Sequence, residues 1–522
     1  MAQLRPRPGT LWGHPCPTRP LAAYGGHVAL PAEVHGSNAE LVALREKAGL
    51  SQQDLAGELN EIARRRFGRS VDLTKKTVGR WERGEVAWPQ PFYRRLLAEH
   101  FQVAADELGF RRPRPSPDAL RRPTGTGLDD LLTLVAAPGR QDPRVEREQA
   151  QWRGHRQAFG ECRRALAVLA EQLYPDHQLP GAEHTGVIAH PSWMPDEPIP
   201  LGQVVLDRIE DAATPLVTGT ERESARVRPL ASTEQRYRRY SHALRDLAPP
   251  TLLENRLCFR LLGVNSSRPA LQLSFGAMGF FDSIDTNEAL AHETALESLT
   301  RDSRGELSLV KPSWRRLPFR KFVGDPFDLA RRPLMGAIGT LTIRGGESPC
   351  IVLHQRDSVR VAGGGGMVHL LPAGVFQPSS VMPECVARDF SLWRNIQREY
   401  AEEFLGQEEF DGTGCSVDYE NEPFATMDAA LADGRLRAYC LGVTLDALTL
   451  AGDILTVVIV EPPLYDELFG TAVDTNNEGA IPARAIPFEE NTLTHLRDAG
   501  CLAPGAAAAL HLAWHHRRQL LR

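Results

Sequence analysis

The chain has 522 residues, of which 42% are hydrophobic and 24% are charged, and its formal net charge is −6. A chain of this length can form roughly two to four domains with sizeable cores. Because the net charge is slightly negative, the whole molecule is not a basic nucleic-acid coat, and any DNA-binding surface must be local. The eight cysteines contain no CxxC pair, which argues against a zinc ribbon or a small disulfide framework.

Targeting segments are not apparent in the sequence. The N-terminal stretch MAQLRPRPGTLWGHPCPTRP has no apolar core of the kind found in signal peptides. The longest apolar stretch, ILTVVIV from Ile454, is too short to span a bilayer. We therefore expect a cytoplasmic protein with no membrane partner and with reduced, mostly buried thiols.

The first predicted elements are helices. Residues 1–36 are rich in Pro, Gly and Arg and are predicted to form a disordered tail. Residues 37–110 then show apolar residues at helical spacing. Ser51 and Thr74 are placed to cap the second and third helices, and Gly84 can end the third.

The third predicted helix carries polar groups that can reach DNA. Trp81 and Val78 should face inward, which leaves a basic side for the major groove. Glutamine amides at the start of the second helix can reach phosphate oxygens. From Arg64 to Arg83 there are eight Lys or Arg against two acids, a local excess in a net acidic chain. The candidate DNA-binding residues are Gln52, Gln53, Thr74, Lys75, Lys76, Thr77 and Arg80. The alternative is a solvated charged face on a protein-binding module.

The motifs ALREKAGLSQQDLAGEL and TKKTVGRWERG together resemble the helix-turn-helix domain of the XRE family of Cro-like repressors. One departure is IARRRFGRSVD from Ile62, which lengthens the junction between the second and third helices. The resemblance implies an all-α domain over residues 37–110 that binds double-stranded DNA. It also implies a homodimer on a two-fold site.

Two connecting regions follow. Residues 111–144 mix arginine with proline and are predicted to form an extended basic linker. Residues 145–245 are predicted to form a helical and irregular connecting region. Within it, Trp152, Phe159, Leu166 and Leu173 recur every seven residues. That stripe fits either a partner helix or an ordinary amphipathic helix packed on its own domain.

Residues 246–522 change to α/β character. The predicted strands are CFRLLGV, ALQLSF, GAIGTLTI, PCIVLHQR, MVHLLPAG, RAYCLGVTL and ILTVVIVE, and the main helices are expected at 389–405 and 504–521. Four glycines from Gly363 to Gly366 fit a hairpin connection better than a phosphate loop, because no Lys-Ser/Thr follows. His354 and His369 lie on strand-like segments and are expected to be structural.

Three glutamates stand out in REYAEEFLG, from Arg398 to Gly406. The spacing of Glu399, Glu402 and Glu403 places them on one face of an α-helix. Such oxygen clusters hold hard cations, usually together with substrate phosphates. The alternative is a solvated helix end in which Arg398 pairs with Glu402.

This stretch resembles the last part of the Nudix box, in which a glycine, five residues, a glutamate and seven residues precede REUxEExGU, with U aliphatic. Gly374 takes the place of the box glycine. The resemblance implies a Nudix-like mixed sheet with helices. It also implies Mg²⁺ or Mn²⁺ held by Glu399, Glu402 and Glu403, with Arg398 orienting them. In a hydrolase, Glu402 and Glu403 would be the catalytic residues.

The box departs from the family pattern. Gly374 and Arg398 are 24 positions apart, more than the box allows, Phe390 stands at the first box glutamate, and Asp389 lies beside it. Three hypotheses remain for this domain. It can sense a phosphorylated or nucleotide-like ligand, hydrolyse nucleoside diphosphate derivatives, or serve only protein contacts. We expect a multidomain transcriptional regulator with a sensing C-terminal domain.

Overall fold

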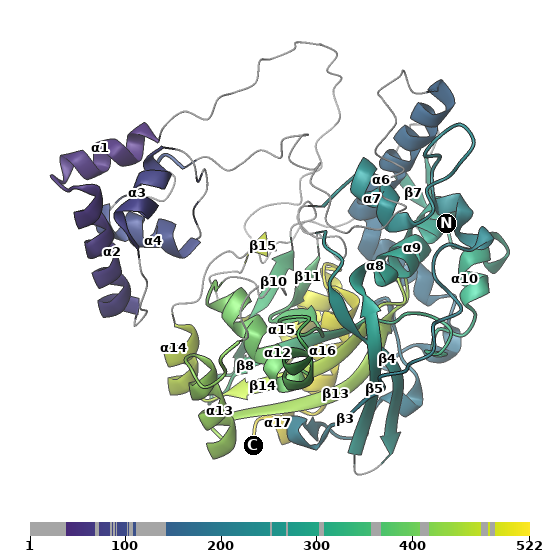
Figure 1. Cartoon of the computed structure of the whole chain (residues 1–522). Helices are drawn as coiled ribbons and strands as arrows, with labels where there is room; N and C mark the ends of the chain where they lie inside the picture. Colours follow the sequence, from purple (N-terminus) through teal and green to yellow (C-terminus); the bar gives the residue numbers. More distant parts are fainter. Residues whose placement is uncertain are drawn as a thin grey trace. The chain divides into compact units, whose positions relative to one another are not determined.

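The computed structural model describes residues 38–67, 73–83, 86, 89, 91–101, 103, 108–110, 142–250, 253–267, 270–301, 307–356, 367–407, 417–470, 479–480 and 486–522. The chain divides into two compact units, residues 1–137 and 138–522. The first unit is helical, and the second combines sheets with helices (Figure 1). The predicted multidomain mixture of an α domain and an α/β domain is confirmed at this level.

The described part of the first unit contains four helices: α1 (Ala39–Lys47), α2 (Gln52–Phe67), α3 (Lys75–Glu82) and α4 (Pro91–Phe101). Polar side chains determine where the helices begin. Asn38 accepts a hydrogen bond from the backbone N–H of Leu41 at 3.1 Å. Ser51 and Asp54 each accept from the other's backbone N–H, so the predicted cap of the second helix is confirmed. The core of the unit consists of Leu41, Leu55, Ala56, Leu59, Ala63, Leu73, Val78, Trp81, Leu96, Leu97, Leu108 and Phe110.

In the part of the second unit that the structure describes, eight strands form one mixed sheet. Its path is β1 (Val187–Ile188), β13 (Leu436–Asp446), β14 (Gly452–Val460), β8 (Gly336–Arg344), β9 (Cys350–Ile351) and β16 (Ile486–Pro487), while β12 (Ala373–Val375) pairs with β8 and β2 (Ile199–Pro200) with β13. Strand β8 runs parallel to β14 and antiparallel to β12. Strand β8 therefore lies next to both the apolar strand β14 and the segment that precedes the glutamates.

Helices cover both faces of this sheet (Figure 1). Successive side chains of a strand point to opposite faces. Ile454 and Val458 pack in the core cluster of α12 (Leu392–Glu399), whereas Leu455 and Val457 pack in the cluster of α16 (Pro504–His515). Burial on both faces explains why this strand is a continuous apolar run rather than an alternating one.

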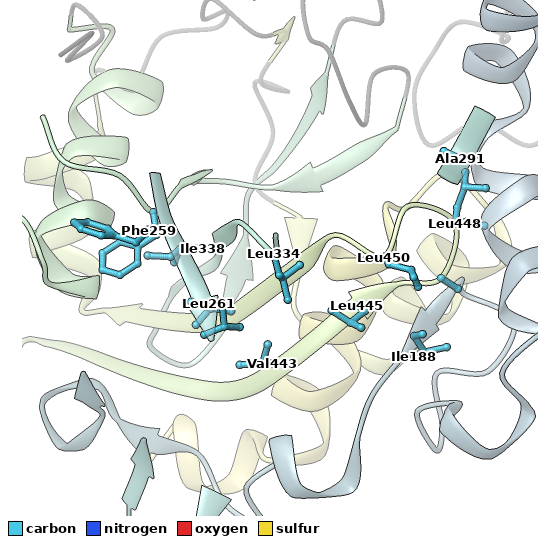
Figure 2. Packing of buried hydrophobic residues seen from close by; sticks show 14 of the residues in the cluster. Ile188, Phe259, Leu261, Ala291, Leu334, Ile338, Val443, Leu445, Leu448 and Leu450 are labelled. Atoms are coloured by element: carbon cyan, nitrogen blue, oxygen red, sulfur yellow. The ribbon is translucent and has the colours of Figure 1, made fainter. Parts of the chain in front are cut away.

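A smaller sheet closes against the larger one. Strand β5 (Ala270–Gly279) pairs antiparallel with β4 (Leu257–Ser267) and parallel with β3 (Val205–Arg208). Backbone N–H groups of Phe259 and Leu261 donate to carbonyls of Phe376 and Leu334, at 2.9 and 2.8 Å. Figure 2 shows Phe259 and Leu261 beside Ile338, so the two sheets share one core.

The remaining elements include one long helix, α6 (Pro143–Glu171). The helices are α7 (Tyr240–Leu247), α8 (Phe280–Ser283), the π turn η6 (Ile284–Glu288), α9 (Ala289–Ser298), α10 (Pro318–Val323), α11 (Pro383–Arg388), the π turn η8 (Tyr400–Phe404), α13 (Phe424–Asp433), α14 (Pro462–Phe469), α15 (Glu490–Asp498) and α17 (Arg517–Leu520). The strands are β6 (Leu299–Arg301), β7 (Leu307–Leu309), β10 (Leu353–Arg356), β11 (Val368–Leu370) and β15 (Gly479–Ala480). Each strand predicted from residue 258 onward falls on an observed strand.

The seven-residue stripe of α6 packs inside its own unit. Trp152, Phe159, Leu166 and Leu173 are all buried. The indole N–H of Trp152 donates to the carbonyl of Val227 at 2.8 Å, and its ring lies 5.4 Å from that of His292 on α9. Of the two interpretations of the stripe, the ordinary amphipathic helix is therefore the one observed.

Several sequence expectations concern the membrane, the unassigned segments and the cysteines, and the structure covers these regions only in part. Among the described residues, no helix has the length and apolar character needed to cross a membrane. The tail at 1–36, the glycines at 363–366 and most of the linker at 111–144 lie outside the described residues. Of the six cysteines that are described, Cys258, Cys385 and Cys440 are buried, whereas Cys162, Cys350 and Cys501 are half-buried, so the expectation of mostly buried thiols is met by only half of them.

Candidate functional site

Helix α3 has one buried side and one exposed basic side. Thr74 caps it: its hydroxyl accepts from the Thr77 N–H, and the Thr77 hydroxyl accepts from the Thr74 N–H, both at 3.4 Å. Val78 and Trp81 are buried, as predicted. The side chains of Thr74, Lys75, Lys76 and Arg80 are exposed, and that of Thr77 is half-buried.

A buried carboxylate holds three helices of the first unit together. Glu82, at the end of α3, is 5% exposed. It accepts from Nε of Arg45 on α1 at 2.5 Å and from Nε2 of Gln52 on α2 at 2.6 Å. The hydrogen bond with Glu82 raises the pKa of Arg45, which burial alone would lower. The ion pair thereby fixes the orientation of α3.

The predicted DNA-binding residues lie at the start of α2 and on α3 with its cap, the two helices that Glu82 and Gln52 join. Gln53 is exposed, whereas the amide nitrogen of Gln52 donates to Glu82, so Gln52 also has a structural role. A phosphate contact by either residue stays a prediction. Between residues 64 and 83, the residues described as exposed and basic are Arg64 and Arg65 on α2, Lys75, Lys76 and Arg80 on α3, and Arg83 just after α3. Arg69 lies outside the described residues.

The glutamate stretch in the second unit is not one continuous α-helix. Helix α12 begins after Ser391, whose hydroxyl accepts from the Arg394 N–H at 3.4 Å, and it gives way to the π turn at Tyr400. The helix expected over 389–405 therefore begins later, at Leu392, and its last turn is a π turn that ends at Phe404. The Tyr400 hydroxyl bonds Thr342 of β8 at 2.8 Å, and its ring stacks on Phe469 at 5.0 Å. The wider turn accommodates this buried side chain, and it alters the α-helical spacing on which the one-face prediction relied.

Two of the three glutamates meet strand β12. A Cβ atom on Gly374 would lie 1.9 Å from Oε1 of Glu399, so only glycine leaves space for this carboxylate. Oε2 of Glu403 accepts from the backbone N–H of Ala373 at 2.9 Å, and Glu403 is buried. Glu402 follows on the same π turn and is half-buried. The structure thus brings the predicted box glycine against the predicted glutamates.

Arg398, which precedes these glutamates, is buried. It donates to the carbonyl of Gln377 at 2.5 Å, to Oδ1 of Asn395 at 3.0 Å and to the Tyr419 hydroxyl at 2.6 Å. Its Nη1 lies 3.7 Å from Oδ2 of Asp389. Arg398 therefore ties α12 to the segment that precedes it.

Asp389 is the acidic partner in this cluster. Burial opposes its ionisation, but hydrogen bonds from Ser379, the charge of Arg398 and a bond from Tyr419 outweigh burial and lower the pKa of Asp389. Phe390, which stands at the first box glutamate, instead packs its ring against Phe259 and Phe376. Asp389 thus supplies the carboxylate next to Arg398, and the half-buried Phe390 packs against the core.

A metal site at these glutamates stays a prediction. Within the described part of the chain, no group of three or more His, Cys, Asp or Glu is arranged to hold a metal ion. Glu399 and Glu403 converge on β12, but Glu403 already accepts the Ala373 N–H. The donor set fits a divalent cation only in part.

A cavity of about 330 Å³ adjoins the same strand. Its lining includes residues 337–339 of β8, β12 from Ala373 to Val375, residues 503–506 at the start of α16, Arg163 of α6 and Glu288 of η6. Gly374 both lines the cavity and lies against Glu399. The cavity and the glutamate turn therefore both lie against strand β12.

A buried polar cluster forms one wall of the cavity. Glu288 accepts from both Arg163 and Arg156 of α6. Burial opposes ionisation of Glu288, yet the two guanidinium groups lower its pKa to about 2. The Tyr240 hydroxyl lies 2.9 Å from Nδ1 of His292, and burial lowers the pKa of His292 to about 3. The lining therefore contains an ionised carboxylate at neutral pH, Glu288, whereas the neutral imidazole of His292 belongs to the buried cluster outside the lining.

Sequence reasoning missed this cavity. Arg163, Glu288 and Gly374 are far apart in the sequence, and none of them belongs to a short motif that predicts a cavity. The closest signal was the small-residue content of GAIGTLTI and of LLPAG, because small side chains leave room beside a sheet.

Comparison with known proteins bears on the first unit alone. A family model described as SP15 N-terminal domain matches residues 41–108. This match covers α1 to α4. No curated protein matches the chain.

Proposed function

We propose that the protein is a sequence-specific DNA-binding transcriptional regulator of the helix-turn-helix type. The observation that carries the proposal is the two-sided helix α3, capped by Thr74, which buries Val78 and Trp81 and exposes Lys75, Lys76 and Arg80. A short helix with basic residues near its start, held by a hydrophobic core, is suited to the major groove. The buried Glu82 keeps it in one orientation.

The second unit is proposed as a Nudix-like domain that senses a phosphorylated or nucleotide-like ligand. Support comes from the mixed sheet between α12 and α16 and from Gly374 against Glu399. The stretched box, in which Phe390 packs against the core at the place of the first glutamate, favours binding over turnover. Ligand occupancy then changes the DNA affinity of a homodimer, which requires different ligand affinities in the two DNA-binding states.

The regulator hypothesis is tested with the full chain. A binding sequence is selected from a pool of random duplex DNA, and its dissociation constant is measured with and without ADP-ribose and nucleoside diphosphates. We expect a bound ligand to change the dissociation constant by at least about fivefold, the lower end of typical coupling energies. If every ligand that binds leaves DNA affinity unchanged, the sensing role is contradicted.

An Mg²⁺-dependent hydrolase of nucleoside diphosphate derivatives is the second candidate. The convergence of Glu399 and Glu403 on β12 favours it. ADP-ribose incubated with Mg²⁺ and the full chain would then be cleaved, and Glu402→Gln would abolish cleavage. Hydrolysis that survives Glu402→Gln would remove these carboxylates from the catalytic role.

A further inference from the structure

The cavity beside β12 combines apolar walls with polar edges. Met335 and Met367 contribute polarizable surface, and Phe280 and Ile338 contribute aromatic and aliphatic surface. Methionine sulfur and aromatic rings make favourable contacts with the flat faces of aromatic ligands. A volume of about 330 Å³ suits a ligand of drug-like or nucleoside size.

The charges of the lining oppose an anionic ligand. Both guanidinium groups of the lining already face a carboxylate, Arg163 at Glu288 and Arg256 at Glu254. Asp446 also lines the cavity and adds a further acidic group. Like charges placed together cost several kcal/mol, so a phosphate or carboxylate would be disfavoured here.

The start of α16 does not offer an anion site either. A helix N-terminus attracts anions through its backbone N–H groups and its dipole. A Cβ atom on Gly505, in the first turn of α16, would lie 2.5 Å from Oδ2 of Asp453. The Asp453 carboxylate therefore lies against the first turn of α16, and its negative charge opposes binding of a ligand phosphate there.

Polar groups at the edges can instead recognise a neutral ligand. Asn287, Gln377 and Thr449 supply amide and hydroxyl donors and acceptors to the lining. Such groups can pair with a neutral acceptor or donor of a ligand, such as a ring nitrogen, a carbonyl or an amino group.

We propose that this cavity binds a flat heteroaromatic ligand of nucleobase or nucleoside size that is uncharged or cationic, and that it discriminates against phosphorylated ligands. The inference rests on the proposed sensing function and narrows its ligand class. A phosphorylated effector would then have to be bound elsewhere on the unit. The polar part of the lining is formed by Arg163 of α6 and Glu288 of η6, and Arg156 of α6 also donates to Glu288.

Isothermal titration calorimetry with the full chain, without DNA or metal, tests the proposal. The probes are adenosine, guanosine, cytidine and uridine, each compared with its 5′-monophosphate. At least one nucleoside should bind, and its monophosphate should bind at least about tenfold more weakly, which corresponds to about 1.4 kcal/mol. Failure of all four nucleosides to bind, or equal or tighter binding of the monophosphate, would overturn the proposal.

Two variants locate the binding site. Val375→Trp fills the cavity from β12 and should weaken nucleoside binding at least tenfold, whereas Val381→Trp, at a position that is 64% exposed and outside the lining, should leave it unchanged. If Val375→Trp does not fold, Ala337→Leu takes its place. Undiminished binding by the folded filling variant would place the ligand elsewhere and overturn the proposal. Because no DNA is present, these outcomes are independent of whether the protein regulates transcription.

Discussion

At the residue scale, single side chains in the second unit are restricted by very close neighbours. Gly374 has no space for a Cβ atom because Glu399 lies against it. Asp389 is ionised although it is buried, because Ser379, Arg398 and Tyr419 stabilise its charge. The sequence placed Gly374 and Glu399 in one motif. It placed Phe390 at the position of the first box glutamate, although Asp389 is the residue that supplies a carboxylate there. The path from β12 to α12 depends on α11 and its tertiary contacts, which local patterns do not reveal.

Gly374→Ala should destabilise the second unit. The new Cβ atom would collide with the Glu399 carboxylate, and overpacking of this kind costs about 1–3 kcal/mol. Chemical denaturation measures the change. Gly202→Ala is the matched control, since a Cβ atom there has no neighbour within 4 Å and should change stability by less than about 0.5 kcal/mol. The double variant Gly374→Ala/Glu399→Ala should recover part of the stability, and no recovery would refute the collision.

Asp389→Asn should reduce stability in a pH-dependent way. Because the pKa of Asp389 is lowered on folding, its ionised form stabilises the native state above the unfolded pKa, and that contribution disappears as pH falls through the lowered pKa. The stability gap between wild type and variant should therefore be widest near neutral pH and narrow below about pH 4. Urea unfolding at several pH values measures it. A gap that widens in acid would contradict the assignment.

At the scale of elements, caps and local patterns predicted helices better than they predicted turns between them. Ser51 and Thr74 cap their helices as expected, because capping depends on neighbours within three residues. The π turn at Tyr400 was missed, since it depends on Thr342 and Phe469, which are distant in sequence. Strands were predicted well where burial on both faces produces continuous apolar runs.

Thr74→Ala should loosen helix α3. Removal of an N-cap costs about 0.5–2 kcal/mol of stability. Amide hydrogen exchange of residues 75–82 in the full chain reports it, and exchange there should speed up while α6 stays unchanged. Unaltered exchange in α3 would show that its packing, rather than the cap, holds its first turn.

At the scale of the whole molecule, the sequence indicated a helical unit and an α/β unit, and both are present. What it could not indicate was the cavity, because the cavity is assembled from α6, η6, β8, β12 and α16. Non-local assembly of this kind follows from strand order rather than from motifs. We therefore assign DNA recognition to one unit and ligand recognition to the other, as proposals.

A homodimer on DNA is also a prediction at this scale. DNA selected by the full chain should contain two related half-sites about one helical turn apart. Analytical ultracentrifugation of the complex should show two protein chains per duplex. A single protein chain on an asymmetric sequence would contradict the dimer.

The salt dependence of DNA binding tests the proposed regulator most directly, when the full chain is compared with Lys75→Ala/Lys76→Ala/Arg80→Ala. These three residues are exposed on α3, so the variant should fold as the wild type does. We expect weaker binding by the variant and a shallower slope of log affinity against log salt, by about one unit for each phosphate that it no longer neutralises. An affinity and a slope that both match wild type would contradict the role of α3 in DNA recognition.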